Sequence, residues 1–169
     1  TITNNTVISS DVLDQSYGIY VNNATNTLIS DNSIKKFYDG ILLSGVQQSQ
    51  INNNNLEQSL SRGVIVVDCF NNVAISSNII TNIPNGFQGI GIMYITNIVG
   101  TSATVSIEGN CILNTSMPID LTNSTTNCLQ LPSIHNNYLY NYSSIGVRSS
   151  QFSGNIGSSS SHGKNSFVS

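Results

Sequence analysis

Residues 51–56 read Ile-Asn-Asn-Asn-Asn-Leu, and this stretch is one copy of a pattern that recurs along most of the 169-residue chain. The pattern is an aliphatic residue, two variable residues, an asparagine, one variable residue and a second aliphatic residue. A period of about 20 to 50 residues is typical of solenoids. The asparagines of the six copies are Asn5, Asn32, Asn54, Asn78, Asn110 and Asn137.

A second motif, a glycine followed by alternating aliphatic residues, keeps step with the first. It reads Gly-Ile-Tyr-Val at 18–21 and recurs at 40–43, 63–66 and 89–92, with weaker forms from Pro118 and Gly146. Alternation of apolar and variable residues predicts strands with one buried face. The two motifs together predict an all-β solenoid, a parallel β-helix of about six to seven rungs stacked about 4.8 Å apart.

The repeated asparagines have a structural explanation. Asparagine tolerates the left-handed backbone conformation of tight turns. Its side-chain amide can also donate to the asparagine one rung on and accept from the one before. We therefore expect these six residues to form an internal ladder, similar to the amide ladders of stacked cross-β assemblies.

Both motifs resemble the repeats of the right-handed parallel β-helix superfamily, which has the pectate-lyase-like fold. The resemblance covers residues 1–147, and we expect 148–169 to be a Gly/Ser-rich C-terminal loop or cap. Members include polysaccharide lyases, polygalacturonases, uronan epimerases, phage tailspikes and surface proteins, so the resemblance implies the fold but not one activity. An open first rung invites aggregation, so we expect an upstream segment from the same chain or another subunit to cover it.

Composition and cysteine usage exclude several classes of function. Charged residues make up 8% of the chain and the net charge is −3, which argues against a nucleic-acid partner. No apolar run is long enough to span a membrane. The three cysteines lack metal-ligand spacing, so we expect no metal or cofactor. Cys111 and Cys128 could pair, or Cys69, Cys111 and Cys128 could all be small buried residues; the sequence does not decide this, nor whether its Asn-x-Ser/Thr sites are glycosylated.

Four charged residues match by sign when the rungs are aligned. The residue before each glycine is Tyr17, Asp39, Arg62 or Gln88, which pairs Asp39 with Arg62. The residue three places after each ladder asparagine pairs Lys35 with Glu57. Such pairs could simply relieve like-charge stacking. Alternatively they could form, with Asp68, a catalytic or sugar-binding face; the candidate residues are Asp39, Arg62, Glu57, Lys35 and Asp68.

The resemblance brings its own expectations for catalysis, and the chain departs from them. Lyases of this fold hold calcium with several carboxylates, but Asp31, Asp39 and Asp68 are scattered. Polygalacturonases carry Asn-x-Asp, Asp-Asp, Gly-His-Gly and Arg-x-Lys motifs, none of which occurs.

Two outward columns are partly apolar where a solvent-facing strand would be polar. Two residues after each glycine stand Tyr20, Leu42, Ile65 and Gly91, and four residues after stand Asn22, Ser44, Val67 and Met93. Exposed apolar patches mark interfaces. We therefore expect an interface at Tyr20, Leu42, Ile65, Val67 and Met93, covered either by a partner such as another copy or by a loop or missing segment.

These observations favour a non-catalytic extracellular β-helix module of a surface, adhesin, filament or virion assembly, with carbohydrate binding as an additional expectation. Its expected partners are other protein chains, other segments of a longer parent chain, or a polysaccharide. The alternative is a polysaccharide lyase or epimerase acting on uronic-acid polymers. Ice binding is disfavoured because threonine forms no regular column.

Overall fold

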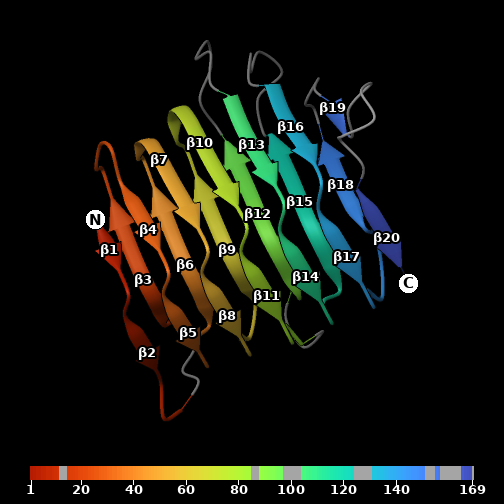
Figure 1. The fold of residues 1–169 in the computed structure, drawn as a ribbon, viewed down its shortest axis with the longest axis horizontal. Coiled ribbons are helices and arrows are strands. Elements are labelled where there is room, and N and C mark those ends of the chain that lie inside the picture. Colours follow the sequence, from red (N-terminus) through yellow and green to blue (C-terminus); the bar gives the residue numbers. More distant parts are fainter. Residues whose placement is uncertain are drawn as a thin grey trace.

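The computed structural model describes residues 1–11, 15–84, 88–96, 104–123, 131–150, 155–156 and 165–168. These residues form a right-handed parallel β-helix, as predicted, whose strands lie side by side from the N-terminus to the C-terminus (Figure 1). The described part contains no helix that is long and apolar enough to cross a membrane.

The strands belong to three parallel sheets, one along each side of the solenoid. Sheet A contains β1 (Ile2–Thr3), β4 (Leu28–Ser30), β7 (Gln47–Asn52), β10 (Phe70–Ser76), β13 (Thr104–Glu108), β16 (Leu131–His135) and β19 (Asn155–Ile156). Sheet B contains β2 (Thr6–Ile8), β5 (Ser33–Lys35), β8 (Asn55–Glu57), β11 (Ile79–Thr81), β14 (Cys111–Leu113), β17 (Tyr138–Tyr140) and β20 (Ser166–Val168). Sheet C contains β3 (Tyr17–Asn22), β6 (Asp39–Ser44), β9 (Arg62–Val67), β12 (Ile90–Thr96), β15 (Met117–Asn123) and β18 (Val147–Ser150).

The chain visits sheets A, B and C in turn, and each strand pairs with the strand one turn away. Six such turns are followed by β19 and β20, which pair with β16 and β17. The segment expected to be a C-terminal loop or cap thus supplies strands to the stack. Its apolar Phe167 lies beside Leu139 in sheet B.

The core forms because one residue type repeats at one register. The inward residues Ile29, Ile51, Ile75, Ile107 and Ile134 are neighbours across sheet A and are fully buried. Inward residues of sheets B and C complete one continuous cluster along the solenoid. Each buried aliphatic side chain contributes about 1.5–3 kcal/mol, so the stacked columns supply most of the stability.

The corner between sheets A and B corrects one detail of the sequence interpretation. The left-handed residue is not the repeated asparagine but the residue before it, with φ between 54° and 65°. Asparagine, aspartate and glycine adopt this conformation most readily. The corner positions are Asn4, Asp31, Asn53, Ser77, Gly109 and Asn136.

The asparagine ladder itself is confirmed, and it extends one residue further than predicted. In each rung the side-chain Nδ2 and the backbone N–H of the asparagine both donate to the Oδ1 of the next asparagine; Asn54 donates to Asn78 Oδ1 with both nitrogens at 3.0 Å. Nδ2 also donates to a carbonyl of the preceding rung, as Asn78 does to Ile51 at 2.9 Å. The last acceptor is Asn165.

The glycine column lets the start of each sheet C strand approach its neighbour closely. A Cβ on Gly63 would lie 2.6 Å from Ile80 Cγ2 and 2.7 Å from the carbonyl oxygen of Gly91. The partner of Gly63 is therefore Gly91, not Gly89, and the sequence alignment of the fourth rung was wrong by two residues. Gly89 instead lies in the bend just before β12, where its φ of 64° is the left-handed conformation that glycine adopts readily.

Replacing Asn78 with alanine should destabilise the whole stack. The substitution leaves the buried backbone N–H of Asn54 without its acceptor, at a cost of about 1–3 kcal/mol. It also leaves the Ile51 carbonyl and Asn110 Oδ1 without the bonds that Asn78 Nδ2 donates. We expect urea unfolding to show a loss of about 2–5 kcal/mol. Asn55→Ala is the control because Asn55 is exposed and directly follows Asn54 on the preceding rung; an equal loss in both variants would contradict the ladder's role.

Replacing Gly63 with alanine should also destabilise the fold, because the new methyl group meets a backbone oxygen and a core side chain. Overpacking of this kind costs about 1–3 kcal/mol. Gly109→Asn should be close to neutral, since Gly109 has a φ of 65° in a column where three of the other five residues are asparagine, and an added Cβ would lie 3.7 Å from its nearest neighbour. Thermal unfolding of the two variants measures the difference between their stabilities. A lowered melting temperature for Gly109→Asn together with an unchanged one for Gly63→Ala would contradict this expectation.

Candidate functional site

The predicted pair of Asp39 and Arg62 is present at the outer face of sheet C. Arg62 donates from Nε to Asp39 Oδ1 and from Nη2 to Asp39 Oδ2, both at 2.7 Å. The two residues begin β6 and β9 and are direct neighbours in the sheet. Asp39 is fully buried, and burial raises the pKa of its carboxyl although the hydrogen bonds from Arg62 oppose the shift.

A second pair of the same geometry lies at the other end of sheet C. Arg148 donates to Asp120 at 2.8 and 2.6 Å, and Asp120 is fully buried. These hydrogen bonds raise the pKa of the Arg148 guanidinium. Sequence reasoning missed this pair, although aligning the weak motifs at Pro118 and Gly146 would have placed Asp120 beside Arg148.

The Lys35–Glu57 pair also forms, with 3.0 Å between Lys35 Nζ and Glu57 Oε2, but it lies in sheet B. The expected grouping of all five candidate residues on one face is therefore wrong. The corner at 36–38 separates sheet B from the start of β6, and Asp68 lies beyond the far end of β9 with φ of 50°. The structure brings together two separate pairs rather than one carboxylate cluster.

Between the two Arg–Asp pairs, the outer face of sheet C is apolar. Ile65, Ile90, Met93 and Met117 form a cluster separate from the core, with Leu42, Val67 and Ile95 packed against it. Met93 lies in the column of Tyr20, Leu42 and Ile65 rather than in that of Val67, which follows from the corrected position of Gly91.

The exposed part of this face is narrower than the sequence suggested. Ile65 and Met93 are only 4% and 9% exposed, because side chains of the same face cover them. Tyr20 is 53% exposed and its ring lies 5.5 Å from that of Tyr17. We define the outer strip as the exposed or half-buried residues Tyr17, Tyr20, Leu42, Val67 and Ile95.

A groove of about 380 Å³ lies on the outer face of sheet A. Its floor includes Ala74, a small residue between Gln50 and Ser106 in the same column. A bulge in β10 between Phe70 and Val73 shifts the register beside it. The exposed or half-buried polar residues along the groove are Asn26, Gln48, Gln50, Asn72, Thr104 and Ser106. No sequence motif marked this feature, because each of these residues is common in the chain.

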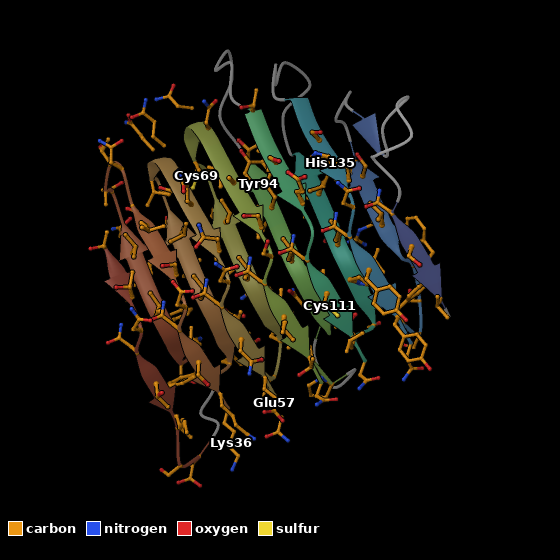
Figure 2. The ribbon with its side chains drawn as sticks, in the orientation of Figure 1. Lys36, Glu57, Cys69, Tyr94, Cys111 and His135 are labelled. Carbon is orange, nitrogen blue, oxygen red and sulfur yellow. The ribbon has the colours of Figure 1, made fainter. Side chains whose placement is uncertain are left out.

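The residues that could bind a soft metal lie apart. Cys69 is buried and donates to the carbonyl of Val67, and burial raises the pKa of its thiol to about 11. Cys111 is half-buried in sheet B, with its pKa also raised by burial, and His135 lies beside Glu108 in sheet A. Figure 2 shows Cys69, Cys111 and His135 well separated. In the described part of the chain, neither Cys69 nor Cys111 is in a disulfide, and Cys128 lies outside that part.

Comparison with known proteins gives one match. The sequence profile of the family described as "Periplasmic copper-binding protein (NosD)" matches residues 1–156. No curated protein and no solved structure gives a significant match.

Replacing Arg62 with methionine should leave the Asp39 carboxylate buried without a partner. We expect a loss of about 3–5 kcal/mol in the free energy of unfolding at pH 7. The pKa of Asp39 is already raised in the folded state. Its carboxyl therefore adds most to the free energy of unfolding below its ordinary pKa near 4, and adds less as the pH rises through the raised pKa. Without Arg62 the pKa rises further, so the loss should be smaller at pH 4 than at pH 7.

Two matched variants separate the causes. Asp39→Asn with Arg62→Met should recover most of the stability at pH 7, because no buried charge remains. Lys35→Met should cost at most about 1 kcal/mol, since both partners of that pair are about one-third exposed. A loss for Arg62→Met that is independent of pH would show that Asp39 is not the affected group.

Proposed function

This chain belongs to the NosD family, and we propose that it is a non-catalytic β-helix module of an assembly outside the cytoplasm. In this proposal the chain binds a second copy of itself through the outer strip of sheet C. The family is described as periplasmic, which agrees with an extracellular location in the broad sense. A role at the cell surface or in a virion is a narrower expectation that this proposal does not need.

The apolar outer face of sheet C is the observation that carries the proposal. A sheet face that is exposed to solvent is normally polar, whereas the outer face of sheet C bears a continuous apolar cluster from β6 to β15. Large aromatic residues at its edge, Tyr17 and Tyr20, are the residue type enriched at protein contacts. Covering the outer strip would remove its exposed apolar area from water.

The charges on this face support association rather than catalysis. Asp39 and Asp120 each have both oxygens occupied by an arginine. A lyase that holds calcium needs several carboxylates whose oxygens are free to bind the metal. A buried carboxylate held bidentately is a structural element, and this disfavours the lyase or epimerase alternative.

A second copy is the partner that fits the surface. The chain carries a net charge of −3, but the acidic residues of this face are neutralised within it by Arg62 and Arg148. Two copies can therefore bring the same face together without repulsion between unpaired charges. A contact of one patch with itself is also the commonest arrangement in homodimers.

Copper does not fit the described residues. Copper(I) prefers thiolate and thioether ligands, and the described residues contain no group of three or more His, Cys, Asp or Glu placed to hold a metal. Met93 and Met117 share a cluster, but Arg62 Nη1 lies 4.0 Å from Met93 Sδ, and this cation opposes binding of a second one. We therefore assign this chain no metal role within its described part.

Sedimentation equilibrium tests the proposed association. We expect the wild-type chain to self-associate and the double variant Tyr20→Ser with Leu42→Ser to dissociate at least about tenfold more readily. Tyr140→Ser is the control, because Tyr140 is similarly exposed, at 44%, but lies in sheet B. A monomeric wild type, or equal weakening by the control, would rule out the sheet C contact.

A further inference from the structure

The groove on sheet A has a chemistry that neither the sheet C contact nor the family description accounts for. All the residues that line it are uncharged, and most carry amide or hydroxyl groups. Only part of this capacity is used within the protein: Thr104 Oγ1 donates to Asn72 Oδ1 at 2.6 Å. The side chains of Asn26, Gln48 and Gln50 are exposed and make no hydrogen bond to another described residue.

The free groups restrict what the groove could bind. An anionic ligand would lose water without meeting a cation, which is unfavourable. An apolar ligand would cover amides and leave them unsatisfied, at about 1–3 kcal/mol each. A ligand with many neutral hydroxyl groups avoids both costs, because hydroxyls and amides each donate and accept hydrogen bonds.

A peptide fits less well than a sugar. Extended peptides usually bind by adding a strand to an open sheet edge. The groove has no such edge, since β7 pairs with both β4 and β10, and β10 also pairs with β13. Recognition here must use side chains on a closed sheet face.

We propose that this groove binds a neutral oligosaccharide lying across the strands of sheet A. The volume of about 380 Å³ falls in the range of small-molecule sites. Polar side chains from successive rungs recur at the strand spacing of about 4.8 Å, so one extended ligand meets equivalent groups on several rungs. The half-buried methyl group of Ala74 leaves room for a sugar ring between Gln50 and Ser106. This site shares the β-helix with the sheet C contact but none of its residues.

Calorimetric titration of the intact chain tests the proposal. The ligands are the neutral hexasaccharides of the cellulose, xylan, mannan and amylose series, with oligogalacturonate as the anionic comparison. We expect at least one neutral ligand to bind and oligogalacturonate to bind more weakly. If no neutral ligand binds at millimolar concentration, or if oligogalacturonate binds more tightly than all of them, the proposal is wrong.

Two substitutions on one strand locate the binding. Ala74→Phe fills the floor of the groove and should weaken binding at least about tenfold. Ser76→Phe is the matched control, two residues further along the same outer face of β10 and outside the groove; it should change affinity by less than about twofold. Unchanged binding in Ala74→Phe would overturn the assignment. If Ala74→Phe does not fold, Gln50→Leu, which removes a free amide at the surface, must weaken binding instead.

Sedimentation of the same samples keeps the two proposals separate. Sugar binding without self-association would refute only the sheet C contact. Self-association without binding of any neutral sugar would refute only the groove.

Discussion

The whole structure depends on how the chain satisfies its backbone at the corner between sheets A and B. A left-handed residue turns the chain there, and the N–H of the following asparagine, which lies between the strands of the two sheets, donates to a side chain of the next rung. The Oδ1 of the next asparagine accepts from that N–H and from the side-chain Nδ2 as well. The repeated asparagine thereby satisfies the backbone at the turn and fixes the register between rungs. Insertions between rungs must leave this point unchanged, which explains why the spacing of the asparagines varies from 22 to 32 residues without disturbing the ladder.

The sequence was sufficient to predict the features that recur in every rung, but not the features that occur only once in the chain. Aligning the repeats is enough to predict the asparagine ladder and the inward isoleucines. The same procedure predicts the pairs Asp39–Arg62 and Lys35–Glu57. The fourth rung was misaligned because Gly89 and Gly91 both satisfy the glycine pattern, and only the close approach of Gly63 to the Gly91 carbonyl distinguishes them. The groove could not be predicted, because the register shift in β10 and the small residue Ala74 beside it each occur once and belong to no repeat.

The three outer faces of the solenoid differ in chemistry because the interior alone secures the fold. Sheet C carries apolar residues bounded by neutralised Arg–Asp pairs. Sheet A carries uncharged polar groups around a groove. Sheet B carries an ion pair between β5 and β8 and the parallel rings of Tyr138 and Tyr140 on β17. A β-helix can therefore keep its core and change each face independently, and a family description such as copper binding need not hold for every member.

Hydrogen exchange of side-chain amides, followed by NMR, tests most directly whether the asparagines form a continuous internal stack. We predict that the Nδ2 protons of Asn32, Asn54, Asn78, Asn110 and Asn137 exchange slowly and with similar rates, because they open only when rungs separate. The exposed amides of Asn53 and Asn55 should exchange fast. Fast exchange at Asn54 and Asn78, equal to that of their exposed neighbours, would contradict the ladder and with it the register of all three faces.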